Sequence, residues 1–132
     1  MPNKSYTFPK SHRLRSRHEV AAVFDARVSD ARGPLVIYAF PNTLPHPRLA
    51  IVISRRVGSA PRRNRIKRLL REAFRLHQHD LPIGYDLVIV VRPHQPMILA
   101  EYQKLMTNLT LRLHRTWFQR RPDAGQTPIP TP

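Results

Sequence analysis

Residues 62–75, with the sequence RRNRIKRLLREAFR, place seven basic side chains and one acid within fourteen positions. At about 100° per residue, a helix here would carry five polar side chains on one face. These are Asn64, Lys67, Arg68, Arg71 and Arg75. The opposite face would carry Ile66, Leu69, Leu70 and Ala73, with Phe74 at its edge. We therefore predict a helix that packs on a core by one side and presents a cationic stripe on the other.

The stripe predicts binding of a polyanion. A solvated helix face usually alternates charge signs to form ion pairs one turn apart, but here only Glu72 opposes the basic residues. Neighbouring arginines therefore repel each other unless phosphates lie between them. Arg62, Arg63 and Arg65 flank the stripe near the helix N-terminus, where the helix dipole also favours phosphate.

Nucleic acid fits this surface better than a membrane does. Arginine outnumbers lysine in the stretch, and the planar guanidinium group binds phosphate through two hydrogen bonds and stacks on bases. The helix lacks a Trp/Phe face that would insert into lipid. No second short helix and tight turn precede it as in a helix-turn-helix. We expect an RNA partner, and neither a membrane nor a DNA partner.

The composition agrees with a polyanion partner. The chain has 132 residues and a formal net charge of +15, from 23 Lys and Arg against 8 Asp and Glu. Such an excess repels itself in the folded state. The absence of cysteine excludes disulfides and Cys-based zinc sites. We find no signal-peptide core and no apolar segment near the roughly 18 residues that span a bilayer, and expect a cytoplasmic protein.

Local signals place three helices. Ser16 and Glu19 form a capping box at the start of the first. Ser59 can cap the basic helix and Pro61 suits its first turn, so this helix should run to about residue 77. The last helix should span roughly residues 98–118, because apolar side chains recur there at spacings of three and four.

Three β-rich runs accompany the helices, at residues 35–40, 48–54 and 85–91. With one further strand whose position is left open, the predicted order is α-β-β-β-α-β-α. This interleaving favours an α/β (α+β) two-layer sandwich with helices packed on a sheet. We predict one domain over residues 1–119, irregular over 1–12, and a disordered Pro-rich tail over 120–132.

No protein active site is apparent. The eight acids are scattered, without the clustered pair that a two-metal nuclease needs. The stretch HQHD at 77–80 comes nearest to a metal or acid–base cluster, but His77 and His79 are two residues apart at a helix end and no third histidine follows at ligand spacing. We expect no catalytic residue and no metal site on the protein.

The basic stretch resembles the signature of the bacterial ribonuclease P protein family. That signature is Arg-Asn-Arg, here residues 63–65, followed by Ile-Lys-Arg and an Arg-Glu pair. The resemblance extends over about residues 8–118. It implies a central sheet with an unusual left-handed β-α-β crossover through the Arg-Asn-Arg helix, against the normal handedness rule. It also implies an endoribonuclease in which this protein binds a catalytic RNA and assists removal of the 5′ leader from precursor tRNA.

The resemblance implies two surfaces. The basic helix and the turn before it would meet the ribonuclease P RNA. The residues that match the family's positions are Arg55, Arg56, Arg63, Asn64, Lys67 and Arg71. The cationic face described above adds the remaining predicted RNA-binding residues, Arg62, Arg65, Arg68 and Arg75. A cleft between the first helix and the sheet would receive the leader of precursor tRNA through Val20, Phe24 and Tyr38. Val20 occupies a position where some members carry an aromatic residue.

Alternatives remain at this stage. Tyr38 could equally be a core residue, and Phe40 reads as core. The resemblance places hydrolysis on the RNA, with Mg²⁺ bound mainly by the RNA subunit and the substrate. A structural RNA-binding protein of the ribosomal type would explain the charge equally well, but not the leader cleft or the length of the match.

Overall fold

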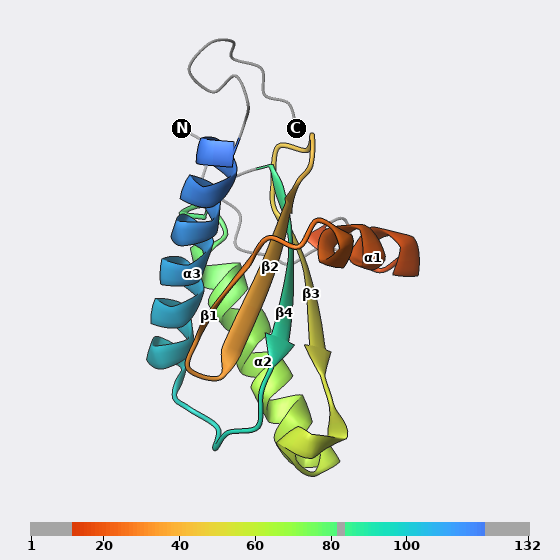
Figure 1. Cartoon of the computed structure of the whole chain (residues 1–132). Coiled ribbons are helices and arrows are strands. Elements are labelled where there is room, and N and C mark those ends of the chain that lie inside the picture. The colour runs from red at the N-terminus through yellow and green to blue at the C-terminus, as the bar shows by residue number, and fades with distance from the viewer. Residues whose placement is uncertain (1–11, 82–83, 121–132) are drawn as a thin grey trace.

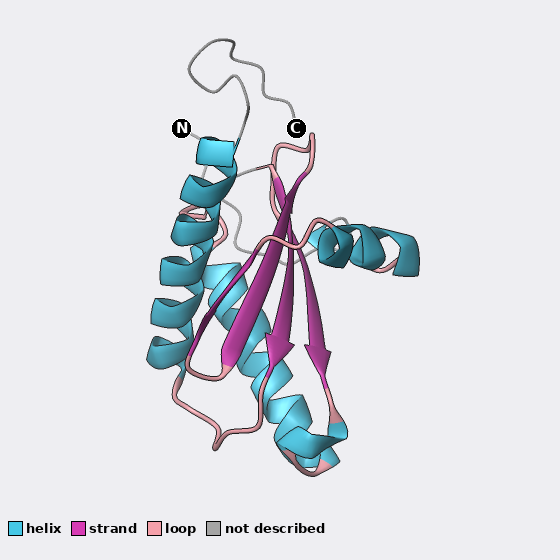
Figure 2. Cartoon of the chain, in the orientation of Figure 1, coloured by secondary structure: helices cyan, strands magenta, loops and turns pink. Residues whose placement is uncertain are grey.

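The computed structural model describes residues 12–81 and 84–120. Its elements are α1 (Arg17–Asp25), β1 (Ser29–Arg32), β2 (Leu35–Pro41), β3 (Arg48–Ile53), the short 3-10 helix η2 (Arg55–Val57), α2 (Ala60–His77), β4 (Tyr85–Val91) and α3 (Leu99–Arg120) (Figures 1 and 2). The predicted order α-β-β-β-α-β-α is confirmed. The predicted irregular segment and tail lie outside the described residues, except for His12 and for Arg120, which ends α3.

The sheet has the strand order β1-β2-β4-β3. β2 pairs with β1 and β4 in antiparallel orientation, whereas β3 and β4 are parallel. Parallel neighbours need a crossover connection, and α2 supplies it. In Figure 1 both strands run downward, β4 lies to the left of β3, and α2 lies behind the sheet. The crossover is therefore left-handed, as the family resemblance implied.

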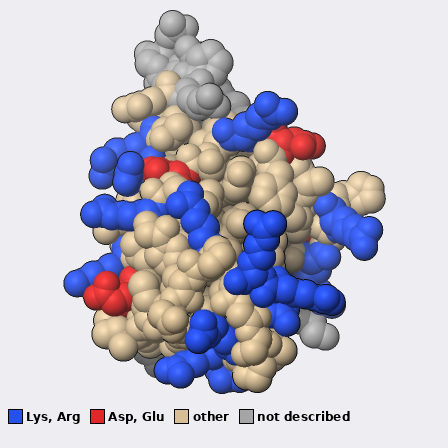
Figure 3. Space-filling model, turned by 60° about the horizontal axis from the view of Figure 1, so that its bottom comes forward, with Lys and Arg blue, Asp and Glu red and all other residues tan. Residues whose placement is uncertain are grey.

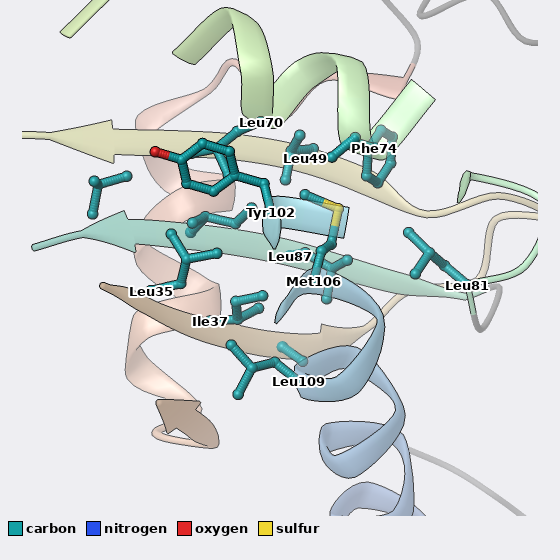
Figure 4. Packing of buried hydrophobic residues seen from close by; sticks show 14 of the residues in the cluster. Leu35, Ile37, Leu49, Leu70, Phe74, Leu81, Leu87, Tyr102, Met106 and Leu109 are labelled. Carbon is teal, nitrogen blue, oxygen red and sulfur yellow. The ribbon is translucent and has the colours of Figure 1, made fainter. Parts of the chain in front are cut away.

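The helices are divided between the two faces of the sheet. α2 and α3 pack together on one face, where alternate residues of β2, including Leu35 and Ile37, meet buried side chains of both helices. Figure 4 shows this core, with Tyr102 and Met106 reaching it from α3. The intervening residues of β2 and β4 face α1 and form a second, smaller cluster. Both faces of the central strand β4 are consequently covered.

The predicted starts of α1 and α2 are confirmed. The Ser16 hydroxyl accepts hydrogen bonds from the backbone N–H groups of His18 and Glu19, and the Ser59 hydroxyl accepts one from the N–H of Arg62. The Glu19 carboxylate, predicted to complete a capping box, instead accepts a hydrogen bond from Arg48. Within the described ranges, no helix is long and apolar enough to span a bilayer.

An ionic network fixes α1 to the sheet. Arg48 on β3 donates from Nε and Nη2 to the two carboxylate oxygens of Asp86 on β4, at 2.8 and 2.7 Å, and from Nη1 to Glu19 on α1, at 2.8 Å. The side chain of Asp86 is only 7% exposed and that of Arg48 18%. Hydrogen bonds to Asp86, above all, raise the pKa of Arg48 despite its partial burial. The network therefore couples three elements through one guanidinium group.

Substitution of Asp86 should reveal this coupling. We expect Asp86→Ala to lower the free energy of unfolding by about 3 kcal/mol, because it removes the main partner of a largely buried guanidinium. Urea unfolding followed by circular dichroism measures the loss. The matched control is Asp30→Ala, which breaks the more exposed 2.9 Å pair with Arg112 and should cost at most about 1 kcal/mol. Equal losses in the two variants would contradict the assignment.

Candidate nucleic-acid interface

One face of α2 carries the predicted cationic stripe. The helix buries Ile66, Leu70, Ala73 and Phe74 against the sheet and α3. On the other side, the five predicted stripe residues line one surface groove together with Arg13 and Glu72. The structure thus brings together the side chains that the helical periodicity placed on one face: Asn64, Lys67, Arg68, Arg71 and Arg75.

The stripe contains one internal ion pair. Arg75 Nε donates to Glu72 Oε1 at 3.0 Å. This hydrogen bond lowers the pKa of Glu72 and raises the pKa of Arg75. Glu72 therefore stays ionised and offsets one of the positive charges, and a phosphate at this end of the stripe would compete with it for Arg75.

Arg63 has a structural contact in addition to its predicted role. Its Nε donates to the carbonyl of Gly58 at 3.1 Å, which ties the first turn of α2 to the preceding loop. Gly58 has a φ of 148°, and a Cβ there would approach Arg62 Cδ to 2.6 Å, so this turn requires glycine. The predicted RNA-binding residues Arg55 and Arg56 lie just before it, exposed on η2.

The basic surface extends beyond the predicted residues, to Arg13 and Arg15. Leu14 is buried and its N–H donates to the carbonyl of Leu49 at 2.9 Å, so the chain runs along the outer edge of β3. Arg13 and Arg15, on either side of Leu14, are exposed and line a groove with Arg71. The sequence signal that could have predicted these two residues is the alternation of basic and apolar residues in Arg-Leu-Arg, which is typical of a strand at the edge of a sheet.

The three predicted leader-binding residues meet between α1 and the sheet. Phe24 on α1 and Tyr38 on β2 form an edge-to-face pair with ring centroids 4.8 Å apart. Val20 belongs to the same cluster, which packs on the buried side chains of Leu14 and Val23. All three predicted residues are half-buried. They therefore combine packing with a remaining exposed surface.

Phe40, predicted as a core residue, is half-buried as well. It packs on the same cluster, and its ring stands edge-to-face to Trp117 at 6.0 Å between centroids. Trp117 in turn donates from Nε1 to the carbonyl of Ala39 at 2.8 Å. Phe40 thus links α3 to the C-terminal end of β2.

Potential catalytic groups are dispersed. Within residues 12–81 and 84–120, no group of three or more histidines and acids is placed to hold a metal ion. In the HQHD stretch, His77 Nδ1 lies 3.5 Å from Asp80 Oδ2, an interaction that becomes an ion pair when His77 is protonated. This contact joins residues three positions apart at the C-terminal end of α2.

Figure 3 shows the end of the molecule that lies at the bottom of Figure 1. Lysine and arginine side chains are spread across this end, and acidic side chains are few and lie toward its margins. The start of α2 and the loop that joins β4 to α3 lie at this end (Figure 1). Lysine and arginine side chains therefore cover this end of the molecule in addition to the stripe on α2.

Comparison with known proteins agrees with these features. Residues 8–117 match the family model described as Ribonuclease P. The ribonuclease P protein from Thermotoga maritima is 30% identical, with a TM-score of 0.69 and coverage of 76% of this chain and 96% of that one. The ribonuclease P protein from Staphylococcus aureus is 27% identical, with a TM-score of 0.69 and coverage of 80% and 97%. The chain belongs to the ribonuclease P family and is a bacterial-type protein subunit of that enzyme.

Proposed function

We propose that this protein binds the ribonuclease P RNA through α2 and the 5′ leader of precursor tRNA through the cluster of Val20, Phe24 and Tyr38. The observation that carries the proposal is the stripe: a row of arginines fixed outward by the burial of the other side of α2. Each guanidinium on this face can bind a phosphate in two hydrogen bonds. Mutual repulsion among the arginines falls when phosphates lie between them.

The protein's contribution in this proposal is electrostatic. It neutralises phosphates where the catalytic RNA and the precursor crowd together, which raises affinity for substrate and for Mg²⁺. Three carboxylates of the protein are already engaged by arginines, since Glu19 and Asp86 are bound to Arg48 and Glu72 to Arg75. We infer that Mg²⁺ is held by the RNA and the substrate, where it supports hydrolysis by water.

The leader would lie against the aromatic cluster. The half-buried rings of Phe24 and Tyr38 offer apolar surface to unstacked bases, as aromatic side chains do in single-strand RNA binding. Arg13 and Arg15 lie between this cluster and the stripe, because Leu14 packs in the cluster while Arg13 lines the stripe groove. If the catalytic RNA lies on the stripe and the leader on the aromatic cluster, the leader would pass over Arg13 and Arg15 between them.

Reconstituted cleavage tests the proposal directly. Precursor tRNA is incubated at low Mg²⁺ with a bacterial ribonuclease P RNA, with and without the protein, and the products are sized at the 5′ end. We expect cleavage at the mature 5′ end when both components are present and none with the RNA alone. Tight RNA binding without stimulation of cleavage would instead support a structural RNA-binding protein of the ribosomal type.

The basic surface of α2 is tested by Arg65→Ala, beside the stripe, combined with Arg68→Ala on the stripe. We expect lower affinity for the ribonuclease P RNA and a salt dependence that is shallower by roughly 0.7 to 0.9 in log–log slope for each lost phosphate contact. Filter binding at several salt concentrations measures both quantities. The charge-matched control is Arg112→Ala with Arg115→Ala on α3. An equal effect of the two double variants would show that only net charge matters.

The aromatic cluster is tested by Phe24→Ala combined with Tyr38→Ala. Stacking on an aromatic side chain contributes about 1 to 3 kcal/mol per base, so the holoenzyme should lose affinity for precursor tRNA and keep its affinity for mature tRNA. Because both rings also pack in the fold, Tyr38→Leu is measured in parallel as a variant that retains apolar volume. Equal losses of affinity for precursor and mature tRNA would contradict the assignment of leader binding to this cluster.

A further inference from the structure

The loop that joins β4 to α3, residues 92–98, lies against the first turns of α2. A groove between them is lined by Pro61, Arg62 and Arg65 from the helix and by Gln95 and Pro96 from the loop. Its polar lining consists of two guanidinium groups and one amide, and none of these five residues is acidic. The groove thus has the charge to hold a phosphate and a neutral group beside it that both donates and accepts hydrogen bonds.

The loop is held in place from the core. His94 Nδ1 lies 2.8 Å from the carbonyl oxygen of Arg92, and Nε2 lies 2.6 Å from the hydroxyl oxygen of Tyr102. Since a carbonyl only accepts, Nδ1 donates to it, and in the neutral ring Nε2 accepts from the tyrosine hydroxyl. The backbone N–H of Met97 donates to the same hydroxyl oxygen at 3.2 Å. Gln95 is therefore carried between two anchored residues.

Tyr102 is a firm anchor, because its ring is fully buried in the core between the sheet, α2 and α3 (Figure 4). Burial raises the pKa of its hydroxyl, while the N–H of Met97 and the positive charge of Arg65 lower it. Arg65 lines one groove together with Gln95 and Pro96 of the anchored loop. The loop and the basic helix therefore form one surface at this point.

The groove continues into the stripe. Pro61 and Arg65 also line the next groove along α2, together with Asn64 and Arg68. Asn64 and Arg68 in turn line the stripe groove. From Arg62 to Arg75 the helix rises by about 20 Å. An RNA strand lying on the stripe would therefore reach the β4–α3 loop without leaving the basic surface.

We propose that the β4–α3 loop is a second RNA-binding element, in which Arg62 and Arg65 hold one phosphate of the ribonuclease P RNA and the Gln95 amide hydrogen-bonds to the same nucleotide. Tyr102 acts through His94 and Met97 as a positioning residue for this loop. The amide can meet a ribose 2′-hydroxyl or a base edge, both of which donate and accept. The inference rests on the proposed function, since it assumes that α2 binds the catalytic RNA.

Site-directed cleavage tests the contact. The chain contains no cysteine, so Gln95→Cys provides one attachment point for iron-EDTA, a local source of hydroxyl radicals. We expect cleavage of the bound ribonuclease P RNA at a small set of neighbouring nucleotides. The matched control is Gln119→Cys at the far end of α3, about 30 Å away along the helix, which should leave those nucleotides intact.

Absence of cleavage from position 95 in a bound complex, or the same pattern from both positions, would overturn the inference while leaving the proposed function standing. Failure of the wild-type protein to bind the RNA at all would overturn both. The two failures are separated by a binding measurement made before cleavage is induced.

Affinity gives an independent readout. Gln95→Ala should weaken RNA binding roughly two- to twelve-fold without changing the salt dependence, because glutamine carries no charge. Gln119→Ala should leave the affinity unchanged. Tyr102→Phe should weaken binding in the wild-type background and have no further effect in the Gln95→Ala background. Additive losses would show that Tyr102 acts on the fold alone and would remove its positioning role.

Discussion

The parallel pairing of β3 with β4 is the constraint on which the rest of the structure depends. Two parallel neighbours cannot be joined by a tight turn and need a crossover connection that runs over one face of the sheet. α2 is that connection. Its apolar side has to meet the sheet, which leaves its other side in water. The arginines on that side are consequently held in a row by the packing of the apolar residues on the opposite side of the helix.

On the other face of the sheet, an apolar cluster and one guanidinium group hold α1. Arg48 connects β3, β4 and α1, and the position of α1 sets the position of Phe24 against Tyr38. Burial of apolar surface therefore supports both the proposed RNA surface and the aromatic cluster, and the ionic hydrogen bonds of Arg48 support the aromatic cluster in addition. The segment around Leu14 joins them, because its backbone is bound to β3 and its neighbours are basic.

Local signals predicted α2 well, because Ser59, Pro61 and the helical period all agree on its start and its orientation. They left β1 unplaced, since Ser29–Arg32 is a short edge strand with the polar sequence SDAR and no apolar alternation. The partners of Arg48 were out of reach for another reason: the pair with Asp86 exists only in the register of the parallel strands. The handedness of the crossover came from the family resemblance and not from any periodicity.

The strand order β1-β2-β4-β3 also has a kinetic meaning. β4 is the last strand in the sequence but an inner strand of the sheet, so both of its neighbours, β2 and β3, are synthesised before it. β2 and β3 have no pairing with each other and can join only when β4 enters between them. The sheet is thus completed only when β4 pairs with both neighbours, and these contacts join residues distant in sequence. Such a topology slows folding. A chain on the ribosome would carry the complete basic helix before it had a sheet to pack it on.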